Sequence, residues 1–320
     1  MKIAFVFPGQ GSQEVGMCRD FYEEFPVVQE TFRQADETLS FALSRIMLEG
    51  PEEELVKTQN AQPAILTTSY AIFKLLKEFL EGNEVVAFAG HSLGEYTALV
   101  CAESLAFADA LRLVHLRGKF MQEAVPLGEG MMIAVIGLNQ AKVEEVLRGL
   151  SPCGIAEIAN VNAPDQIVVS GSRAVVEKCI ESLKNAGAKR VVELKVSAPF
   201  HSSLMKSAED ALAPYLRTTE FSPPVAPVFS NVTASPYPDD LQQFPELLIS
   251  QITSPVRWVE EVLAIWEPAQ NRPDTFFEVG AGKTLQGLIK RIIPDAPCFS
   301  VNSLESFKSV LPILTGERNI

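Results

Sequence analysis

The sequence has few of the side chains that build disulfides, hold metals or act as general bases. Its 5 cysteines are odd in number, widely spaced and without a Cys-x-x-Cys pair, which argues against a disulfide framework or a zinc site. Its 3 histidines, His91, His115 and His201, leave little choice for a reaction that needs an imidazole. We therefore expect no metal and no bound cofactor.

Basic residues are also scarce relative to acidic ones. The chain carries 27 Lys and Arg against 40 Asp and Glu, a formal net charge of −13, which disfavours nucleic acid or an anionic membrane as the main partner. No apolar run approaches the length of a membrane span, and the first apolar run ends at Pro8, too early for a signal peptide. We expect a cytoplasmic protein that binds neither membrane nor nucleic acid, and a monomer is the starting expectation.

The most informative stretch lies at residues 85–102. Residues 85–89 are an apolar run typical of a buried strand, Gly90-His91-Ser92-Leu93-Gly94 is a Gly-x-Ser-x-Gly pentapeptide, and residues 96–102 indicate a buried helix. This order of elements is the context of a nucleophile elbow, in which the serine lies at the apex of a strained turn. The alternative is a tight turn that happens to contain Ser92, and the flanking elements favour the nucleophile.

Other predicted elements frame this stretch. Residues 3–7 indicate a buried strand that breaks into the loop Pro8-Gly9-Gln10-Gly11, at the strand end where parallel α/β sheets keep their sites. Gln62-Pro63 is predicted to open a long helix to residue 80, with the proline in its first turn. A short strand is expected at residues 228–230, after a proline-rich link.

A predicted helix at residues 107–125 carries a second group of interest. Arg117 and Met121 are four residues apart, so they share one face of this helix. An arginine on a helix is most often a solvated surface group, and the spacing alone gives no reason to depart from that interpretation.

Residues 130–196 have a pattern of their own. Their predicted elements follow the order β-α-β-β-α-β of a ferredoxin-like unit. We therefore predict an α/β protein in which residues 1–126 and 198–320 form an α/β-hydrolase-like catalytic domain with a parallel-sheet core. Residues 127–197 form an inserted ferredoxin-like subdomain.

A serine hydroxyl needs a base before it can attack. His91 lies inside the turn, and His115 lies mid-helix among apolar neighbours, where a packed histidine is expected. His201, in a loop downstream of the serine as in α/β-hydrolases, is left as the base, and spacing assigns no Asp or Glu to orient it. The backbone N–H of Leu93 is a natural oxyanion donor, and the loop around Gln10 is the best-placed source of a second.

Several motifs, taken together and in order, resemble the malonyl-CoA:acyl carrier protein transacylase family. They are Pro8-Gly9-Gln10-Gly11-Ser12-Gln13, Gly90-His91-Ser92-Leu93-Gly94-Glu95-Tyr96, Arg117-Gly118-Lys119-Phe120-Met121, Asn162-Ala163-Pro164-Asp165-Gln166, Phe200-His201-Ser202, and Gln251 ahead of Ser254-Pro255-Val256-Arg257-Trp258. The resemblance extends from the first strand to about Gln286. An inserted ferredoxin-like unit is also a feature of that family.

The resemblance implies a role for each matched position. Ser92 would be the acylated nucleophile and His201 its base. The backbone N–H groups of Gln10 and Leu93 would form the oxyanion hole. The backbone carbonyl of Gln251 would accept a hydrogen bond from His201, in place of the carboxylate of a catalytic triad.

The resemblance also implies a substrate. Arg117 would bind the free carboxylate of a malonyl group with two parallel hydrogen bonds, as a guanidinium can. Met121 and Phe200 would line the acyl pocket, and Phe200 would crowd a 2-methyl substituent. The implied reaction is ping-pong transfer of malonyl from malonyl-CoA to the phosphopantetheine thiol of acyl carrier protein, which supplies extender units for fatty acid biosynthesis.

Three alternatives stay open at this point. An acyltransferase of the same fold could serve a polyketide synthase in trans, with malonyl or a substituted malonyl as donor. A serine hydrolase or esterase is a second alternative, and an acyl-carrier-binding subunit with an inactive site is a third. An acidic carrier protein would need a local basic patch on this acidic chain, for which the candidates are Lys189, Arg190, Lys195, Lys283, Lys290 and Arg291.

Overall fold

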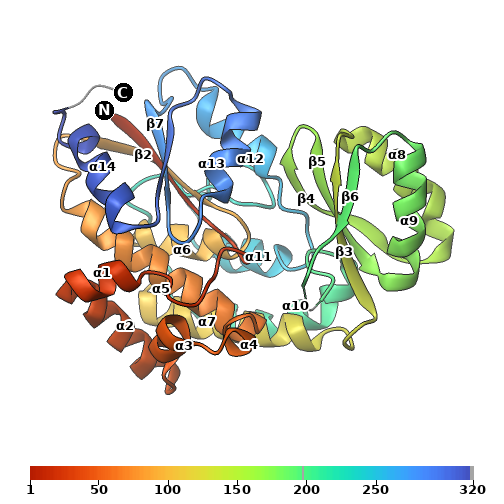
Figure 1. Cartoon of the computed structure of the whole chain (residues 1–320), viewed down its shortest axis with the longest axis horizontal. Helices are drawn as coiled ribbons and strands as arrows, with labels where there is room; N and C mark the ends of the chain where they lie inside the picture. Colours follow the sequence, from red (N-terminus) through yellow and green to blue (C-terminus); the bar gives the residue numbers. More distant parts are fainter. Residues whose placement is uncertain (197, 318–320) are drawn as a thin grey trace.

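The computed structural model describes residues 1–196 and 198–317, and its strands form two sheets (Figure 1). One is parallel, in the order β2-β1-β7-β8, and comprises β1 (Lys2–Phe7), β2 (Glu84–Gly90), β7 (Thr275–Val279) and β8 (Cys298–Val301). The other is antiparallel, in the order β4-β5-β3-β6, and comprises β3 (Gly130–Ile136), β4 (Ala156–Ala163), β5 (Gln166–Ser172) and β6 (Arg190–Glu193). The predicted fold class, a parallel α/β core with a smaller antiparallel unit, is confirmed.

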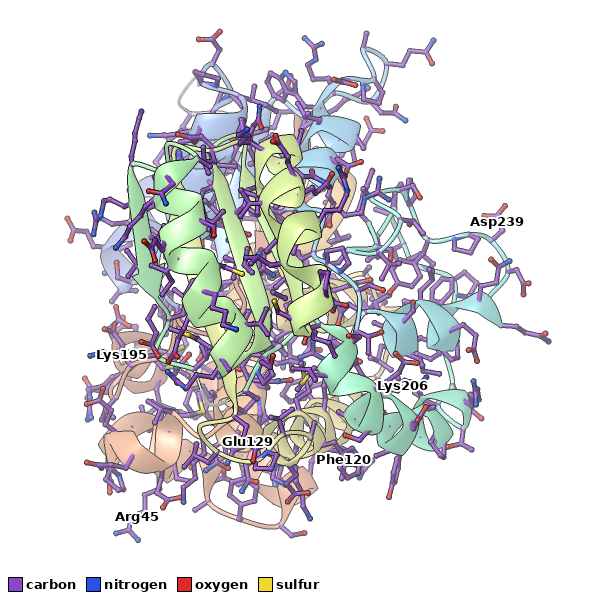
Figure 2. The ribbon with its side chains drawn as sticks, turned by 90° about the vertical axis from the view of Figure 1, so that its right-hand side faces the viewer. Arg45, Phe120, Glu129, Lys195, Lys206 and Asp239 are labelled. Carbon is purple, nitrogen blue, oxygen red and sulfur yellow. The ribbon has the colours of Figure 1, made fainter. Side chains whose placement is uncertain are left out.

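Helices account for most of the remaining chain. Those outside the small sheet are α1 (Arg19–Glu24), α2 (Pro26–Leu39), α3 (Leu43–Glu49), α4 (Glu52–Leu55), α5 (Thr58–Lys77), α6 (Leu93–Cys101), α7 (Phe107–Glu123), α10 (Lys206–Arg217), α11 (Gln243–Ser250), α12 (Trp258–Trp266), α13 (Thr284–Ile292) and α14 (Leu304–Leu314). The small sheet has α8 (Gln140–Leu150) and α9 (Arg173–Asn185) on its outer face (Figure 1 and Figure 2). Single 3-10 turns lie at Ser151–Cys153 and Ser203–Met205.

Both faces of the parallel sheet are buried. Successive side chains of a strand point to opposite faces, so Phe5 and Phe7 of β1 pack on the side of α5, whereas Ala4 and Val6 pack on the side of Trp258 in α12. A sheet covered on both faces needs apolar residues at consecutive positions. This explains why its strands are continuous apolar runs in the sequence.

The small sheet follows the expected β-α-β-β-α-β order. One face packs on α8 and α9, while Met132, Ala159 and Val168 on the other face join the core cluster of the larger part. We propose the predicted division at 126/127 and 197/198 as the domain boundary, and the two sheets support it. Residue 197 is the last of the predicted subdomain and residues 318–320 are the last of the predicted catalytic domain; both lie outside the described residues.

Three local predictions were wrong. Helix α5 begins at Thr58 rather than at Gln62, so Pro63 lies inside it and cannot donate to the carbonyl of Gln59. His115 Nδ1 lies 2.9 Å from this carbonyl oxygen and supplies the hydrogen bond that the proline cannot. His115 is therefore a packed histidine. Residues 228–230 make only isolated bridges, and β6 ends at Glu193, three residues before the predicted end.

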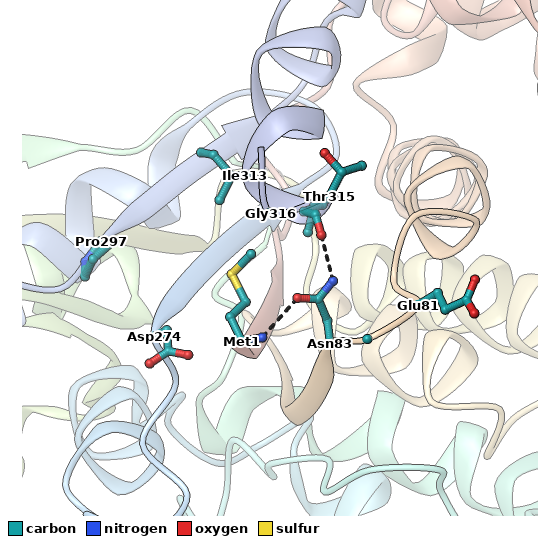
Figure 3. A pocket seen from close by; sticks show the side chains of 10 residues that line it. Met1, Glu81, Asn83, Asp274, Pro297, Ile313, Thr315 and Gly316 are labelled. Carbon is teal, nitrogen blue, oxygen red and sulfur yellow. Dashed lines mark hydrogen bonds between the residues drawn. The ribbon is translucent and has the colours of Figure 1, made fainter. Parts of the chain in front are cut away.

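The site lies at the carboxyl edge of the parallel sheet, although a larger cavity of about 640 Å³ opens at the opposite edge (Figure 3). That cavity is lined by residues that precede the four parallel strands: Met1, Asn83, Asp274 and Pro297. The Met1 amino group donates to Asn83 Oδ1 at 3.2 Å, and Asn83 Nδ2 donates to the carbonyl of Leu314 at 2.8 Å. These contacts join chain segments that are far apart in the sequence.

Candidate active site

Ser92 occupies the turn between β2 and α6 in a backbone conformation that residues other than glycine rarely adopt. Its φ is 53° and its ψ is −104°. A Cβ built on Gly90 would lie 2.0 Å from the backbone of Gly94. A larger residue at position 90 would therefore prevent the end of β2 from packing this closely against the start of α6. The turn therefore has the strained geometry of a nucleophile elbow, as predicted.

His201 is in contact with this serine. Its Nε2 lies 2.7 Å from Ser92 Oγ, and its Nδ1 lies 2.9 Å from the carbonyl of Gln251 and 3.1 Å from that of Ser254. Because a carbonyl can only accept, Nδ1 carries the proton, and Nε2 is left with a lone pair for the serine hydroxyl. Two carbonyls thus hold the ring in the tautomer of a general base.

The environment keeps His201 neutral. Only 4% of the residue is exposed, and burial is the main reason why its pKa falls from 6.5 to about 3. The positive charge of Arg117 lowers the pKa further. An unprotonated imidazole is available to Ser92 across the physiological pH range.

Arg117 is buried beside the serine and is not a surface group. It is 1% exposed, and its guanidinium donates to Gln62 Oε1 at 2.9 Å, to Ser92 Oγ at 3.0 Å and to Gln251 Oε1 at 2.9 Å. All three acceptors are neutral, and its Nε has no partner in the described part of the chain. The buried Glu95 interacts electrostatically with this charge, and the Tyr96 ring centroid lies 5.6 Å from the guanidinium carbon. A buried guanidinium whose hydrogen-bond acceptors are all neutral still favours an anionic ligand that can bond to it directly.

Gln251 joins the parts of the site through its side chain as well as its carbonyl. Its Oε1 accepts from Arg117, while its Nε2 donates to the Ser92 carbonyl at 2.9 Å and to the buried Glu95. The resemblance implied only the backbone role. The side chain places the guanidinium and the elbow in a fixed relation.

A cavity of about 310 Å³ opens above Ser92, between the two sheets. Gln10 and Leu93 line it, as do Met121 and Phe200, which are 1% and 7% exposed. All of the predicted site residues except Gln251 therefore lie in its wall, and Gln251 contacts three of them from behind. Met132, Asn160 and Leu194 form the wall that comes from the small sheet and the segment after it.

Charge in this cavity has one sign. Arg117 lies beside Ser92, and Lys195 is exposed (Figure 2); the cavity wall includes no Asp or Glu within the part of the chain that the structure describes. This is notable in a chain with a net charge of −13. The cavity suits an elongated ligand with negative groups.

Two backbone N–H groups lie at the same sheet edge as the serine. Leu93 is the first residue of α6, so its N–H precedes the first intrahelical hydrogen bond and points out of the helix start. Gln10 follows β1, the neighbour of β2 in the sheet, and the His91 N–H donates to the Phe7 carbonyl at 3.0 Å, which joins the two loops. Gln10 and Leu93 both line the cavity above Ser92.

Sequence reasoning missed several residues of the site. Gln62 was assigned to a helix end, although it faces Arg117 from the second turn of α5. Asn162 was named as part of a family motif and given no role, although it lies in β4 and its Oδ1 contacts His91 Nε2 at 2.8 Å. Asn231 and Glu95 are both fully buried under the elbow. A polar residue within an apolar stretch was the available signal for Glu95; Asn231 had no local signal.

The comparisons with known proteins agree with this geometry. The family model described as an acyl transferase domain matches residues 4–303. A malonyl CoA-acyl carrier protein transacylase of Haemophilus influenzae is 44% identical over 309 residues, covering 97% of this chain and 98% of that protein. The chain belongs to the malonyl CoA-acyl carrier protein transacylase family. A transacylase of Bacillus subtilis with the same name is 42% identical and covers 99% of both chains.

Solved structures of transacylases that act on acyl carrier proteins have the same fold. An acyl-carrier-protein S-malonyltransferase from Bartonella henselae superimposes with a TM-score of 0.93 at 41% identity, covering 98% of this chain and 99% of that one. A malonyl-transacylase solved in complex with a type II polyketide acyl-carrier protein also has a TM-score of 0.93, at 42% identity, covering 98% and 100%. The enzyme is therefore an acyltransferase of this family.

Proposed function

We propose that the chain transfers the malonyl group of malonyl-CoA to the phosphopantetheine thiol of acyl carrier protein through a malonyl ester on Ser92. The observation that carries this proposal is the buried Arg117 guanidinium, which lies 3.0 Å from Ser92 Oγ and bonds only to neutral groups. A cation in that position recognises an acyl group that ends in a carboxylate. The names of the relatives support the same substrate and acceptor.

Acylation begins at the hydroxyl of Ser92. His201 Nε2 takes its proton while Oγ attacks the thioester carbonyl, and the backbone N–H groups of Gln10 and Leu93 stabilise the tetrahedral oxyanion. The imidazolium, held by the carbonyl of Gln251, then gives its proton to the sulfur of the departing CoA. In the second half-reaction His201 deprotonates the carrier thiol, which attacks the ester, and Ser92 regains its proton.

Arg117 supplies the selectivity for a dicarboxylic donor. Two charge-assisted hydrogen bonds to the malonyl carboxylate would each be worth about 1.5–3 kcal/mol. An acetyl group offers no such partner and would leave the buried guanidinium bonded to neutral acceptors only. Met121 and Phe200 line the same cavity and would set the volume beside the carboxylate, where Phe200 would crowd a 2-methyl branch.

A protein acceptor is supported by the rim of the cavity. Val56 and Val196, which line it, are 46% and 37% exposed, and Lys195 adds a positive charge. Of the six basic residues considered for docking, Lys195 is the one that lines the cavity, whereas Arg291 is paired with Asp165. We propose that the carrier docks at this rim, where its prosthetic arm can reach Ser92.

The pathway and the cellular setting are proposals of the same kind. We assign the product to fatty acid biosynthesis, in a cytoplasmic monomer. The solved complex with a type II polyketide carrier keeps a polyketide role as a second candidate. Within the described residues, none of the helices is long and apolar enough to cross a bilayer.

Steady-state kinetics with both substrates test this function. Varying malonyl-CoA at several concentrations of holo acyl carrier protein should give parallel double-reciprocal lines, because CoA leaves before the carrier binds. Carriers from fatty acid and type II polyketide pathways, compared by kcat/KM, decide between the two pathways. Release of free malonate at a rate equal to transfer would instead indicate a hydrolase.

A further inference from the structure

Asn231 lies beneath the elbow and is not part of the mechanism described above. It follows the bridge between Val228 and Phe88 of β2 and is 0% exposed. Its Oδ1 accepts from the Ser92 N–H at 2.7 Å. Its Nδ2 donates to the Gly90 carbonyl at 2.7 Å and to Glu261 Oε2 at 2.8 Å. One amide thus contacts the chain on both sides of His91.

These contacts use the whole hydrogen-bonding capacity of the Asn231 amide nitrogen and fix which way the amide faces. Both hydrogens of Nδ2 have an acceptor, so the oxygen must face the Ser92 N–H. The backbone N–H of Asn231 also donates to Glu95 Oε2 at 3.2 Å. The side chain is therefore held in one orientation by Gly90 and Glu261.

Fixing the Ser92 N–H fixes one of the two peptide planes that meet at the nucleophile. The other is held through the Ser92 carbonyl, which accepts from Gln251 Nε2 at 2.9 Å and from the Glu95 N–H at 3.1 Å. Because a trans peptide sends its N–H and C=O in opposite directions, this second plane turns the Leu93 N–H away from Gln251. The two planes together determine φ and ψ of Ser92.

We propose that Asn231 is a positioning residue, which holds Ser92 at a φ of 53° so that Oγ meets His201 Nε2 while the Leu93 N–H meets the oxyanion. The proposal rests on the role proposed above for Ser92. Without the amide, the N–H of Ser92 and the carbonyl of Gly90 lose the partner that holds them in a fixed relation. The turn then relaxes toward an ordinary backbone conformation.

The test compares Asn231→Ala with Asn302→Ala. Asn302 also donates from Nδ2 to a loop carbonyl, that of Gly282, at 2.9 Å, but lies away from the site, so its variant controls for a general loss of stability. The first readout is the rate of malonyl-Ser92 formation in a single turnover. The second is the rate at which a fluorophosphonate probe labels Ser92, which reports the nucleophile independently of the donor.

For Asn231→Ala we expect both rates to fall on the order of 100-fold with KM for malonyl-CoA unchanged, as for a small displacement of a reacting group. Asn302→Ala should leave both rates unchanged. Wild-type rates in a folded Asn231→Ala protein, or equal losses in the two variants, would overturn the proposal. If Asn231→Ala does not fold, Glu261→Ala, which removes one bond that orients the amide, should still slow labelling, and Glu261→Gln should restore it.

The two readouts separate this inference from the function on which it rests. Labelling of wild-type Ser92 by the probe, without any acylation by malonyl-CoA, would refute the proposed donor and leave the role of Asn231 testable. Acylation by malonyl-CoA with no difference between Asn231→Ala and wild type would refute the role of Asn231 alone.

Discussion

Arg117 donates from Nη2 to Ser92 Oγ at 3.0 Å, and the same oxygen lies 2.7 Å from His201 Nε2. In the free enzyme, the guanidinium is therefore hydrogen-bonded to the nucleophile. In the proposed function, a malonyl carboxylate would compete with Ser92 Oγ for this guanidinium, whereas the serine hydroxyl would keep its bond to His201. Recognition of the donor and activation of the nucleophile would therefore involve the same two side chains.

Arg117→Ala should abolish the preference for malonyl. Losing two charge-assisted hydrogen bonds, each worth about 1.5–3 kcal/mol, lowers kcat/KM for malonyl-CoA on the order of 100-fold or more. Acetyl-CoA, which makes neither bond, should not slow by a similar factor. The measurement is the ratio of kcat/KM for the two donors, with Lys119→Ala on the exposed face of the same helix as the control. A variant that stays selective for malonyl would contradict the role of Arg117.

The pH dependence of acylation should report the lowered pKa of His201. The imidazole is the base only when neutral, and its pKa of about 3 keeps it neutral well below the ordinary value of 6.5. We expect kcat/KM for malonyl-CoA to stay level as the pH falls through 6.5 and to decline only as it approaches the lower value.

A second arm of this experiment addresses the cause. Arg117 lowers the pKa of His201, so Arg117→Gln should shift the decline to higher pH. Labelling by the fluorophosphonate probe gives the profile without a titrating donor. A wild-type decline centred near 6.5, or one that Arg117→Gln leaves in place, would show that this environment does not set the protonation of the base.

These contacts indicate which parts of the site the sequence could predict. Ser92 was predictable because all of its signals are local: an apolar strand, two glycines and a helix start lie within residues 85–102. His201 was found by elimination among 3 histidines. Its orientation by the carbonyl of Gln251 came from the family resemblance, since a backbone group leaves no mark in the sequence.

Other contacts could not be predicted because they depend on tertiary packing. Arg117 resembles a surface residue in its helix, but tertiary packing buries it against Gln62, 55 residues away, and Gln251, 134 residues away. The same holds for Pro63, whose position inside α5 is tolerated because the His115 ring bonds to the carbonyl that the proline leaves free. Fold class depends on the order of strands and helices, which is why it was predicted correctly.

Phe200 should limit the donor at its 2-position. Replacing it with Ala opens the cavity where the 2-methyl group of methylmalonyl-CoA would lie. One methyl group in a pocket is worth about 1–3 kcal/mol, so the preference for malonyl over methylmalonyl should shrink on the order of 10-fold or more. Competition between the two CoA esters in one reaction measures it, with total activity as the control for damage to His201. An unchanged ratio would assign the selectivity elsewhere.

Lys195 should matter more for the carrier protein than for CoA chemistry at Ser92. The lysine is exposed at the cavity, and no Asp or Glu lines that cavity in the described residues. Lys195→Gln should raise KM for acyl carrier protein and weaken the dependence of transfer on salt, because exposed charge pairs are screened. Lys178→Gln, on the exposed surface of α9, is the matched control. Equal effects of salt on both half-reactions would contradict docking at this rim.

The proposed transfer reaction depends most directly on a malonyl ester at Ser92. Intact mass spectrometry after mixing the protein separately with malonyl-CoA, acetyl-CoA and methylmalonyl-CoA measures it. We predict one added malonyl group with malonyl-CoA, located at Ser92 by peptide mapping and absent in Ser92→Ala. Holo acyl carrier protein should remove it, and the other two donors should give little or no adduct. No adduct with any donor, or a malonyl adduct that persists in Ser92→Ala, would contradict the proposed reaction.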